Sequence, residues 1–166
     1  MRFRSGVALS LLLSGCGGSR LASLGPYRSV ECAPYARARS GLSLRGEAYA
    51  WWREAAGRYQ RGQVPVPGSV LVFRRSARLP YGHVSVVRRV VSGREIRVDQ
   101  ANWAHHRIGR DDPVMDVSRA NDWSRVRVWW APSGALGRSA YATYGFIGPG
   151  PAGAGVIASA PYAEAR

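Results

Sequence analysis

The sequence contains no lysine: all 24 of its basic residues are arginine, and with 10 acidic residues they give a formal net charge of +14. A surface of this charge favours polyanions such as nucleic acid, anionic lipid or an anionic cell-wall polymer. The arginines form no compact run, and no nucleic-acid motif such as paired CxxC or an RNP signature is present. We therefore expect a generally cationic surface and no nucleic-acid partner. Which polyanion the protein contacts depends on the cellular compartment in which it is located.

The sequence also lacks a hydrophobic run long enough to span a bilayer, which needs about 20 apolar residues. A cationic start, Met1-Arg2-Phe3-Arg4, precedes a short apolar run from Gly6 to Leu13. This layout is typical of an export signal. The next residues, through Cys16, resemble the lipobox of bacterial lipoproteins, which implies a lipid on Cys16 and a location in the periplasm or cell envelope. The alternative is an ordinary secretory signal, for which Cys16 is incidental.

Cysteine is scarce, because Cys16 and Cys32 are the only two in the chain. If Cys16 carries lipid, Cys32 is the single thiol of an exported protein, and such a cysteine is either reactive or bridged to another molecule. A disulfide between the two is disfavoured, because Gly17-Gly18-Ser19 has the composition of a flexible tether.

The length of 166 residues suits one domain with tails. We expect, in order, a signal peptide, a linker, a folded domain, a C-terminal extension and a disordered tail: 1–16, 17–29, 30–131, 132–147 and 148–166. Within the domain the pattern predicts helices followed by strands: helices from 32 to 40 and 47 to 59, then strands at 69–73, 82–90, 95–99, 114–117 and 126–130. This order predicts an α+β fold with N-terminal helices packed on a small antiparallel β-sheet.

Cys32 stands where the first predicted helix begins. Pro34 follows within the first turn, where a missing N–H is tolerated, and Ser40-Gly41 ends the helix. The unpaired N–H groups of a helix start stabilise a thiolate, so Cys32 is a candidate nucleophile. The alternative is a small, buried and inert side chain.

A predicted hairpin brings a candidate base and a polar partner together. His83 begins one strand directly after Gly82, and Asn102 follows the end of the returning strand. Counting outward from the turn at Ser92-Gly93 places residue 83 opposite about residue 102. Periodicity therefore makes His83 and Asn102 neighbours, as a cysteine nucleophile requires of its base and the orienting group. It does not place Cys32 beside them.

Four motifs in this order resemble the CHAP family, the cysteine, histidine-dependent amidohydrolases/peptidases of the papain-like NlpC/P60 superfamily. The resemblance covers about residues 27–131. Its motifs are Glu31-Cys32-Ala33, Pro67-Gly68-Ser69-Val70-Leu71-Val72-Phe73, Gly82-His83-Val84-Ser85-Val86-Val87 and Val98-Asp99-Gln100-Ala101-Asn102-Trp103. It implies a papain-like fold.

The resemblance implies Cys32 as nucleophile, His83 as general base and Asn102 as the polar residue after the histidine. Many members have an acidic residue two places before that asparagine, where this chain has Gln100, with Asp99 one place earlier. Strand alternation places Gln100 and Asn102 on one face and Asp99 on the other, so we favour the two amides over Asp99 as the third residue.

The implied reaction is cleavage of amide or peptide bonds in peptidoglycan, with no cofactor. We expect Trp103 and Tyr81 to line the substrate groove. His105-His106 lacks a third ligand and predicts no metal site, and Asp111-Asp112 lacks an EF-hand pattern and predicts a turn. Two alternatives stay open: a non-catalytic wall-binding envelope lipoprotein on the same fold, and a basic polyanion-binding module.

Overall fold

The computed structural model describes residues 30–151, of which 44% lie in strands and 16% in helices. The helical elements are α1 (Cys32–Ser40), η1 (Ala48–Ala50), α2 (Trp51–Glu54) and η2 (Ala131–Ser133). The strands are β1 (Tyr59–Gly62), β2 (Val70–Phe73), β3 (His83–Ser92), β4 (Glu95–Ala101), β5 (Ile108–Asp116), β6 (Arg125–Trp130), β7 (Ala135–Leu136) and β8 (Tyr141–Pro151).

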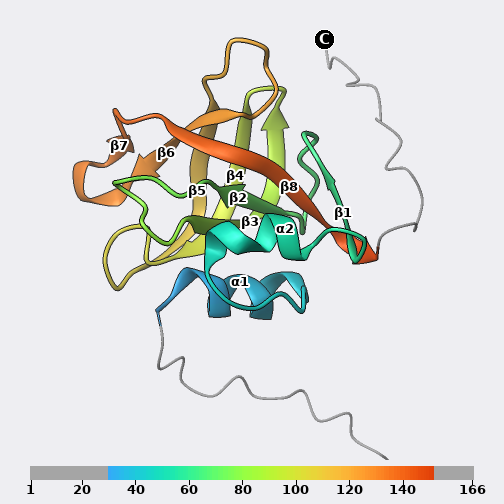
Figure 1. Ribbon diagram of the computed structural model, residues 1–166. Coiled ribbons are helices and arrows are strands. Elements are labelled where there is room, and N and C mark those ends of the chain that lie inside the picture. The colour runs from blue at the N-terminus through green and yellow to red at the C-terminus, as the bar shows by residue number, and fades with distance from the viewer. Residues whose placement is uncertain (1–29, 152–166) are drawn as a thin grey trace, which may run out of the picture.

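Six antiparallel strands form a closed barrel, so the predicted architecture of N-terminal helices on a small sheet is wrong. β2, β3, β4, β5 and β6 are neighbours in chain order, and β8 pairs with both β2 and β6. In Figure 1 the long β8 crosses the front of the barrel, from beside β6 toward β1. The sequence prediction failed because residues 132–147, expected as an extension, supply β7 and most of the closing strand.

Strand β2 shows how the sequence builds two cores. All four of its residues are fully buried, and they alternate between the two sides of the barrel wall. Leu71 and Phe73 belong to the cluster inside the barrel, with Val98, Val126 and Phe146 among others. Val70 and Val72 belong to a second cluster outside it. A continuous apolar run is therefore needed here, because both faces of the strand are covered.

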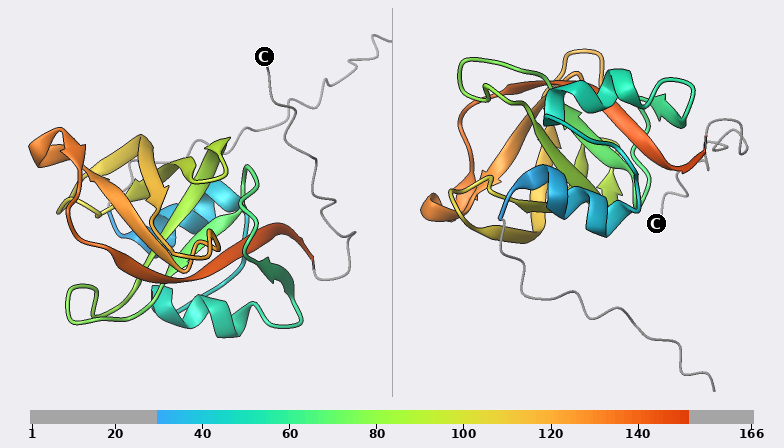
Figure 2. Two further views of the ribbon diagram at one scale, coloured as in Figure 1. Left: turned by 90° about the horizontal axis from the view of Figure 1, so that it is seen from above. Right: turned by 60° about the horizontal axis from the view of Figure 1, so that its bottom comes forward.

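The second core lies between the barrel wall and the helical segments. It joins Ala36 of α1 and Trp51 of α2 to Val70, Val84 and other buried residues of the wall. Both helices lie toward the bottom of the view in Figure 1, and the right-hand view of Figure 2 shows α1 running across the barrel. The first helix begins at Cys32, as predicted, and ends at Gly41, whose φ of 74° is the left-handed conformation typical of a helix end.

The predicted helix over 47–59 is only partly formed. It is a short 3₁₀ turn followed by one turn of α-helix, and residues 59–62 form β1 instead. The predicted hairpin is confirmed: β3 pairs with β4 through Val86↔Asp99 and Val87↔Val98, around a turn after Ser92. Among residues 30–151 no helix has the length and apolar character to cross a membrane. The predicted signal segment with Cys16, the linker and residues 152–166 of the tail lie outside the described residues.

Candidate active site

One surface cleft of about 490 Å³ is lined by four of the residues that the sequence singled out: Cys32, Tyr81, His83 and Asn102. Cys32 enters it from the start of α1, His83 from the start of β3, and Asn102 from the loop after β4. Tyr81, whose side chain is 65% exposed, also lines this cleft. The packing of α1 on β3 and β4 brings the cysteine to the hairpin, which the sequence alone did not predict.

Burial raises the pKa of the Cys32 thiol above its ordinary value. Hydrogen bonding by the backbone N–H of Val84 opposes this rise, and the negative charge of the neighbouring Glu31 adds to it. Burial therefore opposes the stabilising effect on a thiolate that the sequence predicted for the N–H groups of the helix start. The Cys32 side chain lies close to Val84, the residue that follows His83 in β3.

His83 is buried, with 3% of its surface exposed, and two aromatic rings hold it in place. Its ring centroid lies 5.3 Å from that of Phe73, its partner on β2, and 5.0 Å from that of Trp103. Burial lowers the pKa of His83 to about 4, while a hydrogen bond with Gln100 opposes the shift. The imidazole is therefore neutral at neutral pH, as a general base must be.

Gly82 lets the chain turn into β3 at this point. Its φ is +69°, and a Cβ there would lie 2.7 Å from the backbone N of Tyr49 and 3.0 Å from the backbone O of Phe73. The backbone N–H of Tyr49 donates to the carbonyl of Tyr81, so the η1 segment lies directly over this turn. A glycine is therefore required immediately before the histidine.

Of the three candidates for the orienting residue, Gln100 is the one that contacts His83. The distance from Gln100 Oε1 to His83 Nε2 is 3.1 Å, and both side chains are buried. Asn102 lines the cleft, but its amide donates to Glu31 Oε2 and its Oδ1 accepts from the His106 N–H. Asn102 therefore ties the loop to the residue before Cys32.

Asp99 serves a different part of the fold. Its buried carboxylate forms ion pairs with Arg39 of α1 at 2.7 Å and with Arg88 at 3.5 Å. Of the two amides favoured over Asp99, Gln100 contacts His83, whereas Asn102 bonds to Glu31 and to the His106 N–H. Asp112 was not among the site residues predicted from the sequence; its Oδ2 accepts a hydrogen bond of 2.9 Å from Gln100 Nε2. Asp112 lies in β5 rather than in the predicted turn.

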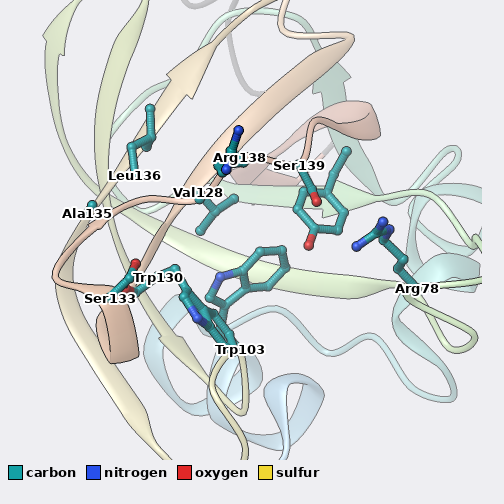
Figure 3. A pocket seen from close by; sticks show the side chains of 11 residues that line it. Arg78, Trp103, Val128, Trp130, Ser133, Ala135, Leu136, Arg138 and Ser139 are labelled. Carbon is teal, nitrogen blue, oxygen red and sulfur yellow. The ribbon is translucent and has the colours of Figure 1, made fainter.

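Trp103 does not line the cleft of Cys32. Its indole packs on His83, Phe73 and Tyr141 and forms one wall of a neighbouring pocket of about 610 Å³. Figure 3 shows this pocket, with Trp103 and Trp130 on one side and Arg78 entering from the other. Arg78 also lines the cleft of Cys32, so this residue lies between the pocket and the cleft and contributes to both.

Two further sequence expectations concern metals. The adjacent rings of His105 and His106 lie against each other, with centroids 3.8 Å apart, on an exposed loop. Within residues 30–151, no three histidine, cysteine, aspartate or glutamate side chains are grouped to hold a metal ion.

Comparison with known proteins agrees with the motifs. The CHAP domain family model matches residues 23–102, just under half of the 166-residue chain. The match confirms the resemblance over this region and ends before β5, so half of the barrel strands lie beyond it. No curated protein matches the chain.

Among solved structures, the chain is similar to an N-acetylmuramoyl-L-alanine amidase from Staphylococcus aureus. The two share 23% sequence identity, with a TM-score of 0.41. The similarity covers 68% of this chain and 30% of the amidase chain.

Proposed function

We propose that this protein is a cysteine amidohydrolase that cleaves amide or peptide bonds of peptidoglycan. The observation that carries the proposal is the shared cleft, which is lined by Cys32 at a helix start and by a buried, neutral histidine whose Nε2 is hydrogen-bonded to Gln100. The CHAP match over residues 23–102 supports the same reaction class. The net charge of +14 suits an anionic wall polymer as the partner.

The reaction proposed is acyl transfer through a thioester. Because Nε2 of His83 is engaged with Gln100, Nδ1 is the ring nitrogen left to accept the thiol proton. The Cys32 sulfur attacks the carbonyl carbon as that proton moves, and backbone N–H groups at the start of α1 stabilise the oxyanion. His83 then returns the proton to the leaving amine, and water hydrolyses the thioester with His83 again acting as base.

This order of events follows from the resting protonation states. The pKa of Cys32 is raised and that of His83 is lowered, and both shifts favour a neutral thiol beside a neutral imidazole. Proton transfer therefore accompanies the attack rather than preceding it. Tyr81 is proposed to line the substrate path at the exposed side of the cleft, and Trp103 to support His83 from behind.

We further propose that the protein works in the periplasm or cell envelope, held by a lipid on Cys16. The supporting feature is the N-terminal pattern of a cationic start, a short apolar run and a lipobox-like segment. Membrane contact then comes through this anchor alone. Metabolic labelling with a fatty-acid analogue, compared between wild type and Cys16→Ala, tests this point.

The test of the function is zymography on purified peptidoglycan, under reducing conditions, with matched variants. Wild type and the exposed-loop control His105→Ala should release fragments, whereas Cys32→Ala and His83→Ala should release none. Mass spectrometry of the fragments identifies the bond that is cut. A folded, reduced wild type that releases nothing would falsify the hydrolase proposal.

The same experiment separates the two rival functions. A wall-binding lipoprotein would sediment with peptidoglycan without releasing fragments. A basic polyanion-binding module would bind equally well as Cys32→Ala, and its binding would be lost as salt is raised.

A further inference from the structure

A chain of two hydrogen bonds runs from His83 into β5. His83 Nε2 lies 3.1 Å from Gln100 Oε1, and Gln100 Nε2 donates to Asp112 Oδ2 at 2.9 Å. Gln100 has none of its surface exposed, so its amide has no solvent to exchange these partners for. We propose that Asp112 is a positioning residue that fixes, through Gln100, which nitrogen of His83 carries the proton.

The argument follows from which groups can donate. An ionised carboxylate only accepts hydrogen bonds, so the NH₂ of Gln100 must face Asp112 and its carbonyl oxygen must face His83. A carbonyl oxygen also only accepts, so Nε2 of His83 must carry the N–H. Nδ1 is then left with its lone pair, which is the form that removes a proton from Cys32.

Without Asp112, the amide of Gln100 alone would not determine which ring nitrogen of His83 carries the proton. A glutamine side chain offers an acceptor and a donor at nearly the same place, and either end can meet one of the two histidine tautomers. The carboxylate makes one of these arrangements much the better one, because the other would bring two acceptors together in a buried place.

A glycine in β5 provides the space for this carboxylate. Gly109 pairs with Gln100 in the β4–β5 register, and a Cβ at Gly109 would overlap Asp112 Oδ2 and lie 2.7 Å from its Cγ. The ladder is also irregular between Val98 and Gln100, where β5 carries Asp112 toward the amide. The glycine at position 109 and the irregular register together place the Asp112 side chain beside Gln100.

The carboxylate itself is half-buried. Burial raises the pKa of Asp112, the Gln100 hydrogen bond opposes the rise, and the charges of Asp99 and Asp111 add to it. Asp112 thus supplies, through Gln100, the negative charge that many CHAP family members carry at the position of Gln100 itself. Gln100 passes the orienting effect of Asp112 on to His83 without placing a buried charge next to the imidazole.

The test compares Asp112→Asn with Asp111→Asn, a matched control whose exposed carboxylate binds Arg89 instead. The inference rests on the proposed base role of His83, so the first readout is independent of turnover: ¹⁵N NMR of the His83 ring. Wild type and Asp111→Asn should show the proton on Nε2 alone. Asp112→Asn should show a mixture of tautomers, and its kcat should fall by about tenfold or more, within the range general-base catalysis contributes.

A double variant provides the rescue. Gln100→Glu with Asp112→Asn moves the carboxylate onto His83, where it also raises the pKa of the ring. At a pH above that raised pKa, the double variant should restore the Nε2–H form and most of the lost kcat. Gly109→Ala should reproduce the loss by displacing Asp112. If Asp112→Asn keeps the wild-type tautomer, the proposal is overturned, whatever its kcat. A wild type with the Nε2–H form but no turnover on peptidoglycan would refute the hydrolase function and leave the role of Asp112 standing.

A second inference comes from the pocket of Figure 3. Its walls are mostly apolar, with two indoles, Val128 and Leu136, and the lining residues include two arginines and no acidic side chain. Within residues 30–151, neither Arg78 nor Arg138 forms an ion pair or a side-chain hydrogen bond. A guanidinium group beside an apolar wall suits a ligand that has a carboxylate and small apolar groups.

We infer that this pocket binds a short peptide with a free carboxylate. The volume of about 610 Å³ lies within the range of small-ligand sites. A neutral sugar would use the indoles and leave both arginines without a partner, so the charge favours the peptide. Because Arg78 also lines the cleft of Cys32, a peptide held here extends toward the nucleophile.

The test is titration followed by tryptophan fluorescence. The probes are acetyl-alanyl-alanine, the same dipeptide with an amidated C-terminus, and N-acetylglucosamine. The free acid should bind at least about tenfold tighter than the amide, and Arg138→Gln should abolish this difference. Arg125→Gln, an exposed arginine of β6 outside the pocket, should bind as wild type does. Equal binding of acid and amide, preference for the sugar, or no binding of any probe would each refute the inference.

Discussion

The protonation of His83 is decided by where its ring lies. The ring is enclosed by Phe73 and Trp103 and has Gln100, a neutral group, at Nε2. A carboxylate in that place would hold a proton on the imidazole at neutral pH, whereas the amide leaves it neutral. The imidazole of His83 is therefore neutral over the whole neutral range, as the proposed role of general base requires.

We predict that this histidine makes the protein less stable in acid. Its pKa falls from 6.5 to about 4 on folding. Between these values the unfolded chain binds more protons, so stability is lost as the pH drops through this window, by about 3 kcal/mol in total. Urea unfolding at about pH 7 and about pH 4.5 should show a drop about 2–3 kcal/mol larger in wild type than in His83→Gln. Equal drops would contradict the burial of a neutral imidazole.

Gly82 provides a second prediction at the level of one residue. Gly82→Ala should destabilise the fold by about 1–3 kcal/mol more than Gly57→Ala. Both glycines have a φ of +69°, so both variants bear the same backbone strain, but a Cβ at Gly57 meets nothing within 4 Å. Thermal or urea unfolding of the two variants isolates the cost of the contact with Tyr49. The explanation would be wrong if the two losses were the same.

Single residues were partly accessible from the sequence. Cys32 and His83 were found because a helix start and a hairpin are local patterns, and both line one cleft. The contact between Gln100 and Asp112 was missed because it depends on the register between β4 and β5, which includes an irregularity. The position of Trp103 behind His83, rather than in the groove, depends on Phe73 and Tyr141, from two other strands.

At the scale of elements, α1 carries Cys32, the proposed nucleophile, at its first residue. Only two of its nine residues, Tyr35 and Ala36, are buried, so apolar packing holds it weakly. The ion pair of Arg39 with the buried Asp99 of β4 supplies a polar link between the helix and the barrel. The end of α1 is thus fixed on the same strand that carries Gln100.

Replacing Arg39 should loosen this link. Arg39→Gln leaves Asp99 with Arg88 at 3.5 Å as its remaining ion-pair partner, and should cost about 1–3 kcal/mol. Arg53→Gln, an exposed position of α2, should change stability by less than about 0.5 kcal/mol. Denaturant unfolding measures both, and alkylation of Cys32 should be faster in the Arg39 variant alone. Unchanged alkylation would mean that α1 does not need the ion pair.

The sequence predicted elements well where a pattern is local and poorly where packing decides. The strands near 69–73, 82–90, 95–99 and 126–130 were recognised from their apolar and alternating runs. Residues 59–62 were assigned to a helix because Tyr59 continues its apolar stripe, yet they pair with β8. The first half of β5 was missed because its glycine, its two adjacent aspartates and its proline have low strand propensity.

At the scale of the whole molecule, closure of the barrel is what local patterns did not reveal. β8 pairs with β2, about 75 residues earlier, and with β6, close to it in the chain. Figure 2 shows β8 running from β6 at one end to β1 at the other. A strand with three glycines and two prolines among its eleven residues gives a weak signal, and its role follows from its partners. The open α+β sheet was predicted because nothing in the sequence marks this pairing.

The charge of the whole molecule makes a separate prediction. With a net charge of +14, attraction to an anionic wall should weaken as salt is raised. Raising salt from about 50 mM to about 300 mM should reduce sedimentation with peptidoglycan, while kcat on a small, uncharged fragment stays within about twofold. A matching loss of kcat would mean that salt acts on the fold or the site rather than on attraction to the wall.

The pairing of β8 with β2, about 75 residues earlier in the chain, also determines when the fold around the proposed site can be completed. Cys32, His83 and Gln100 are all synthesised within the first hundred residues, but Phe146 and Ile147 of β8 complete the two cores that hold them. Pairings between segments so distant in the chain form late and slowly. The nascent polypeptide therefore carries the proposed nucleophile and base before the fold that holds them is complete, and the proposed active site is assembled only after β8 has been made.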